Sequence, residues 1–171
     1  RIRSISTLPE FETEVQQAAK WVAEKIRSLG LELIEITQTE GHPVVYAEWM
    51  KAGPDRPTIL IYGHYDVQPP EPLEDWESDP FDPQVRGDNL YARGASDMKG
   101  QILAFLKAVE AIQSTSQLPV NLKFLLEGEE EIGSPHLTEY IRQNVKELAS
   151  SFCLNCDSGI MDAETPSLTY T

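Results

Sequence analysis

Short apolar runs alternate along this chain with longer amphipathic segments, and this alternation limits the fold more than any other feature. Strand-like runs lie at residues 31–37, 44–50, 58–62, 120–126 and 151–156. Apolar residues at three- and four-residue spacing predict helices at 11–29 and 99–114, and Ser134 as N-cap predicts another that ends near Leu148. Strands that alternate with helices favour parallel pairing with right-handed crossovers. We therefore predict an α/β fold with a mostly parallel sheet flanked by helices.

Two further segments complete the predicted layout. Residues 84–86 and 90–92 flank Gly87-Asp88-Asn89, a typical hairpin turn, whereas residues 68–83 are too rich in proline for a regular element. Residues 167–171 begin another strand, at which the sequence stops. We expect residues 1–171 to be the N-terminal portion of a domain.

Composition excludes several classes of partner. The chain has 171 residues and a formal net charge of −14, so nucleic acid and anionic membranes are not expected partners. No apolar run approaches the ~20 residues of a membrane span. The only cysteines, Cys153 and Cys156, would face opposite sides of a strand, so we expect buried thiols with no disulfide and no shared metal. Sparse cysteine favours a reducing, cytoplasmic location.

Metal-type side chains follow four of the predicted strands or hairpins. His64 and Asp66 follow the strand at 58–62, Asp97 follows the hairpin, Glu129–Glu131 follow the strand at 120–126, and Asp157 follows the strand at 151–156. In open α/β sheets the carboxyl ends of the strands converge on the ligand site. One imidazole with several carboxylates is a donor set for divalent metals of the nitrogen and oxygen type.

The chemistry of these residue types suggests a division of roles. A carboxylate such as Asp66 can fix the tautomer of a ligating His64, and Asp97, before a helix, can bridge two cations. Of the adjacent Glu130 and Glu131, one can coordinate while the other moves a proton. Simpler roles stay open at this point: a structural His64, a helix-capping Asp97, a turn-forming Asp157 and a solvated acidic run. His42 and His136 are expected to be ordinary surface residues.

Other reaction classes lack their motifs. The sequence contains no G-x-S-x-G nucleophile elbow. It contains no G-x-x-x-x-G-K phosphate loop, and no G-x-G-x-x-G motif follows a strand.

Three segments resemble the di-zinc exopeptidases of the aminoacylase/carboxypeptidase G family, in the same order and spacing. They are Gly63-His64-Tyr65-Asp66-Val67-Gln68-Pro69, residues 76–100 with Leu90-Tyr91-Ala92-Arg93-Gly94-Ala95-Ser96-Asp97-Met98-Lys99-Gly100 at their end, and residues 127–134. The first is more similar to the carnosine-dipeptidase-like branch than to the deacetylases or desuccinylases. The resemblance implies a three-layer, zinc-exopeptidase-like catalytic domain, here incomplete and without the lid and dimerisation domain.

The resemblance also implies a role for each site residue. His64 and Asp157 would bind one zinc, Glu131 the other, and Asp97 would bridge them. Glu130 would be the general base that deprotonates a water and later protonates the leaving amine, with Asp66 orienting His64. The expected cofactors are therefore two divalent ions, zinc or else cobalt or manganese, and a cis peptide is expected between Asp97 and Met98.

The expected substrate is a dipeptide or a small N-acyl amino acid, hydrolysed by a homodimer that forms through the lid domain. The family's second histidine ligand lies beyond Thr171, and neither His42 nor His136 matches it, so we expect this chain alone to be inactive. Three alternatives stay open: a non-catalytic metal-binding module, an amidohydrolase of the deacylase type, and a dimeric structural protein whose acids solvate a rim.

Overall fold

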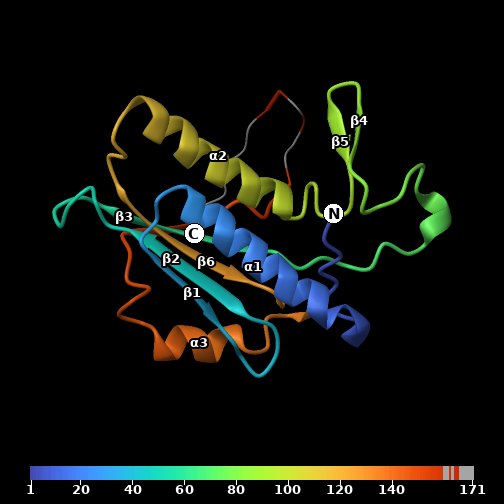
Figure 1. Cartoon of the computed structure of the whole chain (residues 1–171), viewed down its shortest axis with the longest axis horizontal. Helices are drawn as coiled ribbons and strands as arrows, with labels where there is room; N and C mark the ends of the chain where they lie inside the picture. Colours follow the sequence, from blue (N-terminus) through green and yellow to red (C-terminus); the bar gives the residue numbers. More distant parts are fainter. Residues whose placement is uncertain (160–161, 163, 166–171) are drawn as a thin grey trace.

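The computed structural model describes residues 1–159, 162, 164 and 165. Its helices are α1 (Glu12–Ser28), α2 (Lys99–Thr115) and α3 (Leu137–Gln143), as Figure 1 shows. Its strands are β1 (Leu33–Thr37), β2 (Val44–Trp49), β3 (Thr58–His64), β4 (Gln84–Arg86), β5 (Asn89–Tyr91), β6 (Asn121–Glu127) and β7 (Phe152–Asn155). Short 3-10 helices cover Pro9–Phe11, Leu73–Asp75 and Glu130–Ile132. The strand predicted at residues 167–171 lies outside the described residues.

The main sheet has the strand order β1-β2-β6-β3-β7, and β4 and β5 form a separate hairpin. The strand β3 pairs in parallel with both β6 and β7, whereas β2 is antiparallel to β1 and β6. The strand β2 therefore runs against the other four. The predicted α/β sheet with helices on its faces is confirmed, and it is mixed because the short turn after β1 returns the chain alongside it.

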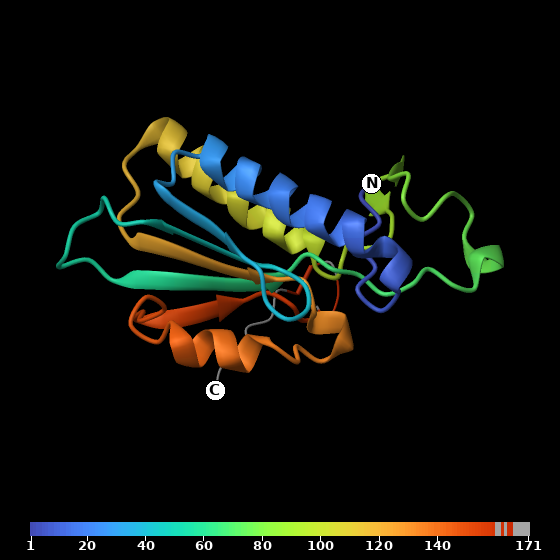
Figure 2. The same ribbon diagram turned by 60° about the horizontal axis from the view of Figure 1, so that its bottom comes forward.

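The helices cover both faces of this sheet (Figure 2). The helices α1 and α2 lie on one face and α3 on the other. The central strand β6 is buried along its whole length, with Phe124 fully buried. Successive side chains of a strand point to opposite faces, so Phe124 packs under α1 and α2 while Leu125 packs with Tyr140 of α3. This packing holds the carboxyl ends of β3, β6 and β7 together.

Two predicted details are wrong. Ser134 does not cap a long helix: its φ is 51°, its hydroxyl donates to Glu127 Oε1 at 2.8 Å, and α3 begins only at Leu137. The buried carboxylate attracts the hydroxyl that would otherwise cap the helix. The cysteines are free as predicted, but Cys153 is exposed because β7 is the edge strand among the described residues. No helix in the described part of the chain has the length and apolarity to cross a bilayer.

Candidate metal centre

The carboxyl ends of three adjacent parallel strands form the candidate site. His64 is the last residue of β3, which lies between β6 and β7. Glu130 and Glu131 lie in the 3-10 turn that follows β6, and Asp157 lies two residues beyond β7. The strand order therefore brings these side chains to one edge of the sheet, as expected for an open α/β fold.

The imidazole of His64 is completely buried and faces acidic groups on both sides. Its Nδ1 lies 3.1 Å from the carbonyl oxygen of Asp66 and 3.3 Å from Asp66 Oδ1. Since neither oxygen can donate, Nδ1 carries a proton. The other nitrogen, Nε2, points into the cluster of carboxylates.

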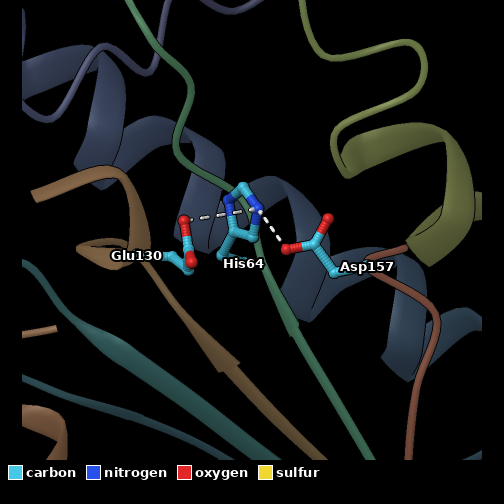
Figure 3. A group of neighbouring side chains, drawn as sticks. All are labelled: His64, Glu130 and Asp157. Carbon is cyan, nitrogen blue, oxygen red and sulfur yellow. Dashed lines mark ion pairs between the residues drawn. The ribbon is translucent and has the colours of Figure 1, made fainter. Parts of the chain in front are cut away.

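Carboxylates from three different segments lie around Nε2 of His64. The distances are 3.0 Å to Asp97 Oδ1, 3.5 Å to Asp157 Oδ2 and 3.9 Å to Glu130 Oε2. Figure 3 shows His64 between Glu130 and Asp157, with both carboxylates directed at the ring. Burial alone would lower the pKa of His64, but the carboxylates of Asp66, Glu130 and Asp157 outweigh it and raise the pKa to about 9. A cation is therefore favoured at this point.

These side chains fit a divalent metal. Donor atoms of His64, Glu130 and Asp157 lie within 4.8 Å of one another, and so do those of His64, Asp97 and Glu131. A neutral imidazole with several carboxylates suits zinc and related ions. Within the described residues, these two groups are the ones in which three such donors converge.

Asp66 connects the histidine to the acidic turn. Its carboxylate is fully buried and accepts hydrogen bonds from the main-chain N–H groups of Glu130, at 3.3 Å, and Glu131, at 3.1 Å. The same carboxylate lies beside His64 Nδ1. One side chain therefore orients the imidazole and both acids of the turn.

The three acids of Glu129–Glu131 have different surroundings. Glu131 is held by Gln68, whose main-chain N–H and side-chain amide donate to its carboxylate at 3.1 and 3.0 Å. Glu130 is 38% exposed at its side chain. Partial burial raises the pKa of Glu130, His64 lowers it, and the charges of Glu131 and Asp157 raise it further. Glu130 and Glu131 are both partly exposed, but Glu131 is held by Gln68.

Glu129 is buried and has its own set of partners. Its carboxylate accepts from His136 Nδ1 at 2.9 Å and from the main-chain N–H of His42 at 3.1 Å. The prediction that His42 and His136 are ordinary surface residues is wrong, because both are half-buried around this carboxylate. Glu129 therefore anchors the acidic turn to the loop after β1 and to the start of α3.

A tight turn carries Asp97 to the site. The main-chain N–H of Gly100 donates to the carbonyl of Gly94 at 3.1 Å, and a Cβ atom at Gly100 would overlap the carbonyl oxygen of Ala95. Only glycine fits there, which explains the glycine in the predicted motif. The expected cis peptide between Asp97 and Met98 is wrong; in the described chain the cis bond is Glu71–Pro72, and cis bonds cost far less before proline.

The structure brings all six predicted residues together: His64, Asp66, Asp97, Glu130, Glu131 and Asp157. Sequence reasoning missed Gln68, although it lies in the motif around His64 and two residues after Asp66. It also missed Ser6, whose hydroxyl donates to Asp66 Oδ2 at 2.6 Å. Nothing in the sequence pairs residues that lie 60 positions apart.

Comparison with known proteins decides the family. The model of "Peptidase family M20/M25/M40" matches residues 60–169. This range includes the six predicted site residues and Gln68, whereas Ser6 lies outside it. The chain belongs to this family. The resemblance to metal-dependent exopeptidases inferred from the three motifs is thereby confirmed.

The relatives include dipeptidases. The chain is 34% identical to the Beta-Ala-His dipeptidase of Mus musculus over 98% of its own length and 36% of the mouse protein. It is 32% identical to the cysteinylglycine-S-conjugate dipeptidase of Corynebacterium striatum, over 95% of the chain and 36% of that protein. The M20 family metallo-carboxypeptidase Sso-CP2 of Sulfolobus solfataricus superposes with a TM-score of 0.84 at 38% identity, over 96% of the chain and 36% of the other. The M20 chain thus spans about a third of each relative.

Proposed function

We propose that this chain is the N-terminal portion of the catalytic domain of a metal-dependent dipeptidase. The reaction is hydrolysis of the peptide bond of a dipeptide, or of the amide bond of a small N-acyl amino acid. The observation that carries the proposal is the set of distances around Nε2 of His64, where carboxylates from three segments lie within 3.9 Å. The similarity to dipeptidases of the family supports the substrate class.

In this proposal the cluster holds two divalent ions, zinc in the first place and cobalt or manganese as alternatives. His64 and Asp157 would hold one ion, Glu131 would hold the other, and Asp97 would contribute to both. Bound ions of this kind polarise a carbonyl group and lower the pKa of water. The remaining residues position these ligands: Asp66 holds His64, and Gln68 holds Glu131.

Glu130 moves the proton. As a general base it accepts a proton from the attacking water, and as a general acid it returns the proton to the leaving amine. Two features of its surroundings suit this role. Partial exposure of its side chain admits water, and its pKa is raised toward the pH at which such a group can both accept and donate. A group permanently coordinated or permanently paired could not alternate in this way.

The parts outside this chain are also part of the proposal. We expect a second histidine ligand and a lid domain in the longer protein, with a homodimer formed through the lid. The 171-residue chain alone then binds metal weakly and hydrolyses nothing. A non-catalytic metal-binding module would have no use for an exposed carboxylate such as Glu130 beside the ligands.

The test compares two substitutions within the proposed machinery. Calorimetric zinc titration of the chain should show binding that His64→Ala abolishes and Glu130→Gln retains. In the longer protein, Glu130→Gln should reduce dipeptide hydrolysis by about 10²–10⁴-fold, the usual contribution of a general base. Retained hydrolysis in Glu130→Gln would contradict its assignment, and zinc binding unaffected by His64→Ala would contradict the metal centre.

A further inference from the structure

The segment Ser4–Ser6 packs directly against the loop that carries His64 and Asp66. Ser4 and Ile5 are almost completely buried, and Ser6 is 8% exposed. Ile5 pairs with Val67 in a parallel bridge, and the main-chain N–H of Val67 donates to the carbonyl of Ser4 at 2.9 Å. The segment is thus hydrogen-bonded to the loop in the manner of an extra strand.

Two serines in this segment make contacts of equal length but of different kinds. The hydroxyl of Ser4 donates to the main-chain carbonyl of Tyr65 at 2.6 Å. The hydroxyl of Ser6 donates to the carboxylate of Asp66, also at 2.6 Å. Ser4 therefore holds the backbone of the loop, whereas Ser6 holds the side chain that orients the site.

The Ser6 carbonyl also has a partner, so the residue is fixed on both sides. His42 Nε2 lies 3.2 Å from this carbonyl oxygen, and the main-chain N–H of His42 donates to Glu129. The position of Ser6 is therefore set by the same loop that anchors the acidic turn. Its hydroxyl is directed at Asp66.

The carboxylate of Asp66 connects Ser6 to His64 and to the acidic turn. Oδ2 accepts from Ser6 and from the N–H of Glu131, while Oδ1 accepts from the N–H of Glu130 and faces His64 Nδ1. A buried carboxylate requires such donors, and loss of the shortest one allows it to rotate or shift. Any shift of Asp66 moves the imidazole and the turn together.

We propose that Ser6 is a positioning residue of the M20 metal centre. Its hydroxyl locks the carboxylate of Asp66, which in turn sets the ring of His64 and the main chain of Glu130 and Glu131. Ser6 contacts neither substrate nor metal in this proposal. The expected effect of Ser6 on metal binding rests on the proposed function. The effect of Ser6 on the main chain of the acidic turn does not depend on a metal.

The first test therefore uses the metal-free chain. Amide hydrogen exchange, followed by NMR, is compared between Ser6→Ala and the matched control Ser4→Ala. Loss of the Ser6 hydroxyl should speed exchange at the amides of Glu130 and Glu131 by about tenfold, with amides of β6 unchanged, because local opening precedes exchange. Equal acceleration in Ser4→Ala, or none in Ser6→Ala, would overturn the proposal.

The second test measures zinc affinity by calorimetry on the same variants. Ser6→Ala should weaken zinc binding by about tenfold, the lower end of the effect of outer-shell partners, while Ser4→Ala changes it by less than about twofold. Ser6→Thr, which keeps the hydroxyl, should restore the affinity. Equal losses in both alanine variants would show a merely structural role.

The two measurements separate this inference from the proposed function. If the unmodified chain binds no zinc, the metal centre of this chain is refuted, and the exchange experiment alone decides the role of Ser6. If Ser6→Ala does not fold, Ser6→Cys takes its place, since a thiol has a similar shape but is a weak donor. Exchange at Glu130 and Glu131 in Ser6→Cys that matches the unmodified chain would then overturn the inference.

Discussion

The metal-free chain should lose stability as the pH rises, and His64 should be the cause. The folded chain holds the pKa of this buried imidazole at about 9, against an ordinary value of 6.5. Between these values the folded state binds more protons than the unfolded state, so the free energy of unfolding falls as the pH increases. The contribution is complete below pH 6.5 and lost once the pH has passed through 9.

The size of the effect follows from the same two values. Each tenfold change in proton affinity corresponds to about 1.4 kcal/mol, so a pKa of about 9 instead of 6.5 is worth about 3 kcal/mol. A small domain is stable by roughly 5–15 kcal/mol in total, so this loss is large enough to measure. Lys99 acts in the opposite direction, because burial lowers its pKa from 10.5 to about 8 and stability recovers between these pH values.

The variant His64→Gln separates the two contributions, since Lys99 is present in both proteins. Urea unfolding with a chelator present gives the free energy of unfolding of each protein across the range from about pH 6 to about pH 10. The difference between the proteins should change by about 3 kcal/mol in favour of His64→Gln as the pH rises. If the difference in free energy of unfolding between the two proteins stays constant with pH, the neighbouring carboxylates do not hold His64 in its protonated form, and the reasoning is refuted.

Three further outcomes test the site and the core. Zinc at a concentration of about 100 times its dissociation constant should stabilise the chain by about 2.7 kcal/mol. The melting temperature should then rise by roughly 5–10 °C, and an unchanged melting curve would contradict the metal centre. Gly41→Ala should destabilise the chain by about 1–3 kcal/mol in urea unfolding, because a Cβ atom there would overlap the carboxylate of Glu129. An unchanged free energy of unfolding would show that this carboxylate moves freely. Phe124→Ala should lower the free energy of unfolding by about 3–5 kcal/mol. As a control, Val85→Ala, at a residue that is 74% exposed, should change it by no more than about 0.5 kcal/mol. Similar values for both variants would contradict the assigned core.

The parts of the fold that depend on local pattern were predictable. The apolar run at 58–62 and the periodic residues of 99–114 correspond to β3 and α2, and β2 begins at the predicted Val44. The strand β6 is buried along its whole length, and its apolar residues Leu122 and 124–126 are a strong strand signal although Lys123 interrupts the run. Convergence of the site residues was also predictable. Each of them follows a strand, and the carboxyl ends of neighbouring parallel strands lie at the same edge of the sheet.

Details set by partners distant in the sequence were not predictable. Ser134 has the residue type of a helix cap, but its hydroxyl is taken by the buried Glu127, and only the folded chain brings the two together. The thiol of Cys153 lies on a strand of suitable apolarity, yet it is exposed because that strand is at the edge of the sheet formed by the described residues. The partner of Asp66 is Ser6, and its own neighbours in sequence give no sign of the contact.

The charge balance of the site bears on the number of metal ions. Five carboxylates lie around the ring of His64 or in contact with its neighbours, from Asp66, Asp97, Glu130, Glu131 and Asp157. Without metal, a protonated His64 offsets only one of these charges. The neighbouring carboxylates raise the pKa of His64 against the effect of burial, whereas partial burial first and then the charges of Glu131 and Asp157 raise the pKa of Glu130. One divalent ion that displaces the proton still leaves three negative charges close together, whereas a second leaves one. The remaining charge is that of a buried carboxylate such as Asp66, which two N–H groups and the Ser6 hydroxyl already stabilise. This charge count supports the proposal that the cluster holds two divalent ions instead of one.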